Sequence, residues 1–123
     1  MKWIGTSLLL VSIAIACNSR EQLICGKWQA YQTLENHMPL QIDHSEITFV
    51  FDDHGLYQYT GSNGYREMGT FSIRDNTLYT LDTLNKASSE KALEIVKLTP
   101  DSLFLGMTVE GNPRILKLYK VKQ

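Results

Sequence analysis

Long basic runs, ligand-spaced histidines and familiar catalytic motifs are all missing from this sequence of 123 residues. No block of Lys and Arg is longer than two residues, so the chain offers no electrostatic basis for binding nucleic acid. His37, His44 and His54 fall in expected loops or turns and lack the spacing of a convergent metal site. A P-loop, a nucleophile elbow and a zinc motif are also absent. We therefore expect no enzyme activity, no cofactor and no metal site.

Two acidic segments are better explained as loop and turn structure than as catalytic or cation-binding sites. The Asp-His-Ser segment at 43–45 contains triad residue types, but adjacent residues on a loop cannot form a nucleophile–base–orienter geometry. Asp52 and Asp53 precede Gly55, and this combination is typical of a tight turn between two strands. We expect the Asp side chains to cap that turn and Gly55 to adopt a positive φ.

A hydrophobic run long enough to cross a membrane is missing as well. The apolar segment 3–16 has about 14 residues, whereas a spanning helix needs about 20. It follows the single basic residue Lys2 and ends in the small residues Ala14 and Ala16, just before Cys17. This layout predicts a signal peptide over residues 1–16, cleaved before Cys17.

The fate of the Cys17 thiol has two interpretations. As a loose lipobox, the segment predicts lipidation of Cys17, with residues 17–22 as the lipidated cysteine and a short polar tether. As an ordinary A-x-A cleavage site, it leaves a thiol that could form a disulfide with Cys25. We favour the lipoprotein, with Cys25 as a small buried residue. The protein is then exported to the cell envelope, where the bilayer is its partner. Asn18, in place of Asp, favours the outer membrane.

Residues 23–123 are expected to form one domain with one core. Removal of the signal leaves 11 Lys and Arg against 13 Asp and Glu, a nearly neutral balance. No repeat or interdomain linker is present, and about 107 residues suit a single small domain. We expect a monomer.

Short β-rich runs recur along this domain at intervals of about 8–12 residues, a rhythm typical of an all-β sandwich or barrel. Segment 91–98 begins with a helix-like composition, but it runs into a turn and is better explained as a strand. Gly69, inside a strand, predicts a bulge or a tight bend. We expect an antiparallel up-and-down meander that closes into an eight-stranded barrel, with a β-sandwich as the alternative. The expected strands are 24–34, 46–51, 56–60, 65–73, 78–84, 91–98, 103–109 and 114–121.

An ordered set of motifs resembles the small lipocalin-like lipoproteins of Bacteroidetes-type bacteria. Gly26-Lys27-Trp28 matches the G-x-W signature, and three further segments follow the pattern of these proteins: 51–57, 69–78 and 95–103. The resemblance implies a non-enzymatic barrel that binds a small hydrophobic or amphipathic ligand. In lipocalins an Arg near the end of the last strand stacks on the signature Trp. Here the last strand offers lysines instead, at Lys117, Lys120 and Lys122.

The aromatic residues supply the candidate binding sites. Trp28 is expected chiefly to plug one end of the barrel, while the wider ligand-binding set comprises Trp28, Tyr31, Phe49, Phe51, Phe71, Leu105 and Met107. Tyr57, Tyr59 and Tyr65 flank an Asn-Gly hairpin and would form a surface patch if they point outward. That patch supports the alternative function, an envelope module that binds a protein or a glycan. Thr83 and Ser102 also match an O-glycosylation pattern known in such bacteria.

Overall fold

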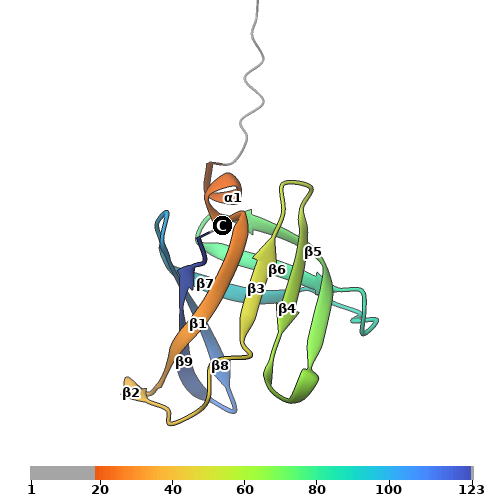
Figure 1. Cartoon of the computed structure of the whole chain (residues 1–123). Helices are drawn as coiled ribbons and strands as arrows, with labels where there is room; N and C mark the ends of the chain where they lie inside the picture. The colour runs from red at the N-terminus through yellow and green to blue at the C-terminus, as the bar shows by residue number, and fades with distance from the viewer. Residues whose placement is uncertain (1–18, 123) are drawn as a thin grey trace, which may run out of the picture.

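The computed structural model describes residues 19–122, which form a closed β-barrel with one short helix at its end (Figure 1). None of the helical segments within 19–122 has the length and apolar character needed to cross a bilayer. The elements in chain order are α1 (Ser19–Ile24), β1 (Gly26–Glu35), β2 (Met38–Pro39), β3 (Thr48–Phe51), β4 (Leu56–Thr60), the 3-10 turn η1 (Ser62–Gly64), β5 (Arg66–Arg74), β6 (Thr77–Asp82), β7 (Lys91–Leu98), β8 (Ser102–Val109) and β9 (Asn112–Lys120).

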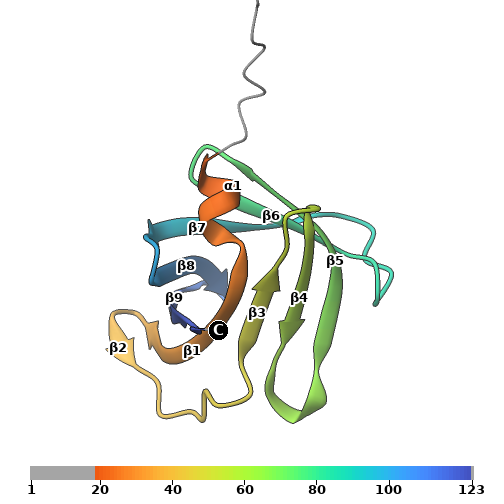
Figure 2. The same cartoon turned by 45° about the horizontal axis from the view of Figure 1, so that its top comes forward.

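The strands pair in sequence order, and β9 returns to pair with β1. All pairings are antiparallel, as short connections between consecutive strands require. The tilted view of Figure 2 shows the strands curling round a common axis. The predicted eight-stranded meander barrel is confirmed, and segment 91–98 is a strand. One further short strand, β2, pairs only with the far end of β1.

The turns form for the reasons that the sequence indicates. The Asp52 carboxylate accepts hydrogen bonds from the backbone N–H groups of His54 and Leu56, each at 2.9 Å. Gly55 has φ +76°, the left-handed conformation that glycine adopts without steric cost. The loop between β4 and β5 also uses left-handed conformations, at Asn63 and Gly64. The predicted turn chemistry at Asp52 and Gly55 is confirmed.

Two bulges interrupt the alternation of side chains along the strands. The β1–β9 register shifts between Ala30 and Gln32, and the β7–β8 register shifts between Ile95 and Lys97. The skipped residue of the β1 bulge is Tyr31, which lies on the outside of the barrel with 48% of its surface exposed.

Gly69 allows a close backbone approach between β5 and β6 rather than a bulge. Gly69 lies inside the β4–β5 register, opposite Tyr57, and forms the terminal pair of the β5–β6 register, opposite Asp82. A Cβ atom at this position would lie 1.8 Å from the carbonyl oxygen of Leu81. A side chain there would therefore force the two strands apart.

Helix α1 covers one end of the barrel, where a polar tether was expected up to residue 22. Ile24 is fully buried, and the Glu21 carboxylate accepts a hydrogen bond from the backbone N–H of Ile73 at 3.1 Å. The Arg20 guanidinium donates to the side-chain oxygen of Asn76. The chain between the predicted signal and the barrel thus folds onto the barrel from Ser19 onward. The predicted signal peptide and Cys17 lie outside the described residues.

Trp28 closes the same end from inside. Its side chain is completely buried, and its indole N–H donates to the carbonyl oxygen of Ile24 at 2.8 Å. The Lys120 ammonium lies 4.6 Å from the centre of the Trp28 ring and donates to the carbonyl oxygen of Cys25 at 2.6 Å. Lys120 is thus the residue of the last strand that supplies the cation over the signature Trp.

Candidate ligand-binding site

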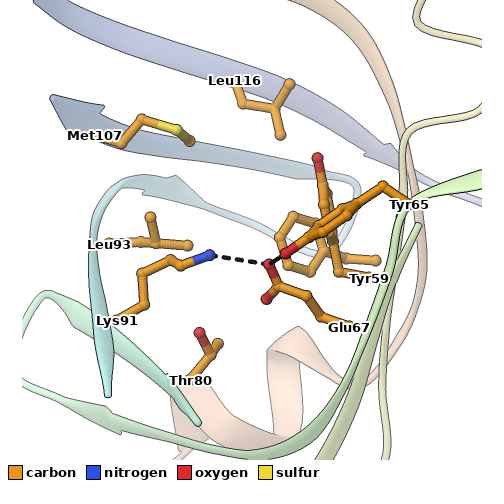
Figure 3. Close-up of a pocket in the computed structure, with 9 residues that line it drawn as sticks. Tyr59, Tyr65, Glu67, Thr80, Lys91, Leu93, Met107 and Leu116 are labelled. Carbon is orange, nitrogen blue, oxygen red and sulfur yellow. Dashed lines mark hydrogen bonds and ion pairs between the residues drawn. The ribbon is translucent and has the colours of Figure 1, made fainter. Parts of the chain in front are cut away.

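The end of the barrel opposite α1 contains a cavity of about 230 Å³ (Figure 3). Its walls come from every strand between β3 and β9, together with the residue just before β5. The lining residues are Phe49, Tyr59, Tyr65, Glu67, Thr80, Lys91, Leu93, Met107 and Leu116. A second hollow of about 130 Å³ shares Tyr59, Met107 and Leu116 with the first. The two hollows therefore adjoin each other.

One side of the cavity is apolar. Leu93 and Leu116 are buried, and Met107 packs against the core (Figure 3). Phe49 contributes an aromatic wall, with its ring centre 4.7 Å from that of Tyr59. This side can take the hydrophobic part of a ligand.

The other side carries a buried carboxylate. Glu67 is only 4% exposed, and three side chains donate hydrogen bonds to it. The Tyr57 hydroxyl donates to Oε1 at 2.9 Å, while the Tyr65 hydroxyl donates to Oε2 at 2.7 Å. The Lys91 ammonium lies 2.9 Å from Oε2 and reaches it across the cavity from β7 (Figure 3).

The strand register explains this cluster. Along β5, Glu67 and Ile73 are buried on the inner face, whereas Arg66 and Arg74 are exposed on the outer face. Tyr59 on β4 is the direct cross-strand partner of Glu67, and Tyr57 lies two residues further along the same face. A carboxylate at an inward position of β5 therefore meets tyrosines at inward positions of β4.

The protonation states follow from these contacts. Burial raises the pKa of Glu67, but the hydrogen bonds from Tyr65, Lys91 and Tyr57 outweigh burial and lower it below the ordinary value. Burial and the Glu67 carboxylate together raise the pKa of Tyr57 strongly. The hydrogen bond to Glu67 raises the pKa of Tyr65 to about 12. At neutral pH the cluster is an anionic carboxylate held by two neutral phenols and one ammonium.

The predicted ligand-binding residues separate into three locations. Phe49 and Met107 line the cavity. Trp28, Phe51 and Leu105 are buried in the barrel core, and Phe71 packs edge-on against Phe51 with ring centres 4.9 Å apart. Tyr31 lies outside the barrel, beside Tyr119, because it alternates with the inward residues Trp28 and Ala30 along β1. The structure therefore brings two of the seven residues to one site.

The predicted surface patch of three tyrosines is wrong for Tyr57. Tyr57 is only 2% exposed, because it lies on the inner face of β4 and its hydroxyl reaches Glu67. Tyr59 and Tyr65 line the cavity, although half of the surface of Tyr65 is exposed. Sequence reasoning missed Glu67 and Lys91. The alternation along β5 is the one signal that could have placed Glu67 inside.

The histidines make other contacts. His44 is half-buried, and its Nε2 lies 2.9 Å from the hydroxyl of Thr33. His54 lies 3.5 Å from the Asp53 carboxylate on the exposed turn after β3. Within residues 19–122, no group of three or more His, Cys, Asp or Glu side chains is placed to hold a metal ion.

Comparisons with solved structures identify the fold. A lipocalin-like protein from Bacteroides uniformis ATCC 8492 superposes with a TM-score of 0.60 at 16% identity, over 80% of this chain and 99% of the other. An uncharacterized protein from Bacteroides eggerthii DSM 20697 gives a TM-score of 0.54 at 18% identity, with the same coverage. No family model matches the chain. A search of curated proteins finds no match either. The chain thus has a lipocalin-like fold.

Proposed function

We propose that this protein is a non-enzymatic, monomeric lipocalin-like module that binds a small amphipathic molecule in the cavity opposite α1. The observation that carries the proposal is the division of that cavity into an apolar side and a buried polar side. Ligand sites are typically apolar hollows with a few polar groups that fix orientation. Leu93, Met107 and Leu116 supply the first part, and Glu67 with Lys91 supplies the second.

The volume limits the size of the ligand. An apolar cavity of about 150 Å³ holds benzene, and pockets for drug-sized ligands measure about 300–1,000 Å³. The cavity of about 230 Å³ lies between these sizes. It suits a molecule with a single ring or a short chain and one polar group. A long acyl chain would need the neighbouring hollow as well.

The proposal places the protein at the cell envelope as a lipoprotein of the small lipocalin-like group. The apolar segment 3–16, the small residues before Cys17 and the G-x-W motif at 26–28 support it. A diacylglyceryl group on Cys17 would anchor the barrel to the bilayer, at the outer membrane, with α1 nearest to the anchor in the chain.

Calorimetric titration with three single-ring probes tests the binding function. The probes are 2-phenylethylamine, which is a cation at pH 7, neutral 2-phenylethanol and anionic 3-phenylpropanoate. At least one should bind, and Leu93→Phe should abolish binding because the larger ring fills the cavity. Val96→Phe is the matched control, since Val96 lies on the same strand but is exposed. Failure of all three probes would refute a binding function for this cavity.

Intact-mass analysis of the membrane fraction tests the anchor. The mature protein should carry a diacylglyceryl adduct on Cys17, and Cys25 should react as a free thiol. Cys17→Ala should move the protein to the soluble fraction. A soluble wild-type product with a Cys17–Cys25 disulfide would contradict the lipoprotein assignment.

A further inference from the structure

The partners of Glu67 differ in how easily they can leave. Tyr57 is buried on the neighbouring strand, and Tyr65 lies only two residues before Glu67 in the chain. Lys91 instead reaches Glu67 with a long side chain (Figure 3). The Lys91 side chain is 58% exposed. Its ammonium can rotate into water without disturbing a strand, while the Tyr57 and Tyr65 hydroxyls continue to hold the buried carboxylate. The two phenols are therefore fixed, whereas the cation is exchangeable.

We infer that the natural ligand carries a protonated amine, which replaces the Lys91 ammonium on Glu67 while its apolar part enters the cavity. This inference rests on the proposed function and specifies the chemical class of the ligand. Lys91 then acts as an internal substitute for the ligand's ammonium. It keeps the buried carboxylate paired when the cavity is empty.

Three features of the cavity favour a cation. Oε1 of Glu67 accepts one hydrogen bond from Tyr57 and, as a carboxylate oxygen, can accept another. The rings of Tyr59 and Tyr65 lie beside the carboxylate (Figure 3), with centres 6.0 Å apart, and aromatic faces attract ammonium groups. Asp82, on the inner face of β6, does not line the cavity, but its negative charge helps to raise the pKa values of Tyr57 and Tyr65 and so adds to the negative field around Glu67.

An anionic head group meets a less favourable arrangement. It would have to pair with Lys91 while the Glu67 carboxylate stays 2.9 Å from the same ammonium. Like charges at such distances repel strongly where water is excluded. Arg114, which lines the neighbouring hollow, is already paired with Glu35 at 3.3 Å. The described cavity wall therefore has no unpaired cation to offer an anion.

The three probes introduced above test this inference, because they share one ring and differ in charge. We expect 2-phenylethylamine to bind at least about tenfold more tightly than 2-phenylethanol, because a hydrogen bond between two charged groups is stronger than one with a neutral hydroxyl. The anion 3-phenylpropanoate should bind most weakly. Tightest binding of the anion, or equal binding of all three, would overturn the inference and leave the binding function intact. Failure of all three would refute the binding function itself.

Two substitutions sharpen the test. Glu67→Gln should remove the preference for the amine over the alcohol, since the amide keeps the shape but not the charge. Lys91→Met should raise the affinity for the amine, because the competing internal ammonium is gone. Lys97→Met is the matched control: Lys97 lies on the same strand, outside the barrel, near the ring of Phe104. If Lys91→Met lowered the affinity for the amine, Lys91 would be a ligand contact and the inference would be wrong. Should Glu67→Gln fail to fold, Lys91→Met decides alone.

Discussion

The two ends of this barrel use the same kinds of residue in different ways. At the α1 end, Trp28 and Lys120 direct their polar groups at backbone carbonyls, which cannot move away. At the opposite end, Glu67 and Lys91 direct theirs at other side chains around a hollow. A polar group fixed to the backbone stabilises the fold. A polar group fixed to a flexible side chain leaves room for exchange with a ligand.

The two lysines show the contrast most clearly. Lys120 lies over the Trp28 ring and bonds the carbonyl oxygens of Cys25 and Leu23. Lys91 bonds only one carboxylate oxygen among the residues that the structure describes, and most of its side chain faces water. We therefore assign Lys120 to stability and Lys91 to binding.

The largest expected effect is at the closed end. Trp28→Ala should lower the free energy of unfolding by about 3–5 kcal/mol, because it removes the largest fully buried side chain and leaves a cavity. Urea unfolding followed by circular dichroism measures it. A loss below about 1 kcal/mol would show that Trp28 is no plug and would remove the contrast between the ends.

The second prediction compares the lysines directly. Lys120→Met should cost about 2 kcal/mol, because it removes charge-assisted hydrogen bonds to the backbone and the cation over Trp28. Lys91→Met should cost less, about 1 kcal/mol, because the Lys91 side chain is 58% exposed and the Tyr57 and Tyr65 hydroxyls still donate to the buried Glu67 carboxylate when the ammonium is gone. Both values come from the same unfolding experiment. Equal losses for the two variants would mean that Lys91 is structural too.

The third prediction concerns acid. Because the folded-state pKa of Glu67 is lowered, its stabilising contribution is present above the unfolded value of about 4.3 and is lost as pH falls through the lower folded value. The difference in melting temperature between wild type and Glu67→Gln should therefore shrink below about pH 4. A difference that stays constant down to pH 2 would show that the charge of Glu67 does not contribute.

The smallest effect is expected in alkali. The raised pKa values of Tyr57 and Tyr65 contribute stability that is present below about pH 10 and is lost as pH rises through the folded values. Burial and the Glu67 carboxylate also raise the pKa of Tyr59, so three phenols should ionise later than the remaining tyrosines when phenolate absorbance is followed. Glu67→Gln should bring the titration of Tyr65, about 12 in the wild type, closer to normal. Simultaneous ionisation of all tyrosines in the folded protein would contradict the cluster.

Sequence reasoning predicted the barrel better than the cavity. The strands are set by local signals, such as the Asp52–Gly55 turn and the alternation along 46–51, so their number and order could be predicted. Trp28, expected to plug one end of the barrel, is completely buried there and bonds the carbonyl oxygen of Ile24 at the end of α1. The short helix α1 was missed because Ser19–Gln22 is polar, and only Ile24 is buried against the barrel.

The cavity depends on register between distant strands, which no local signal reveals. Tyr31 was expected to line the ligand site because it is aromatic, yet it lies on the outer face, out of phase with the inward residues Trp28 and Ala30. Tyr57 and Tyr65 were grouped correctly, but as a surface patch, because their shared partner Glu67 is visible only once β4 and β5 are paired. Lys91 arrives from β7, 24 residues further along the chain.

Amide chemical-shift mapping during a titration with 2-phenylethylamine tests the central claim most directly. We predict that the shifts concentrate at the open end, around Tyr59, Tyr65, Glu67, Lys91 and Leu93, and that the indole N–H of Trp28 stays unchanged. Shifts centred on Trp28 and α1, or on the outer face around Tyr31 and Tyr119, would contradict the claim.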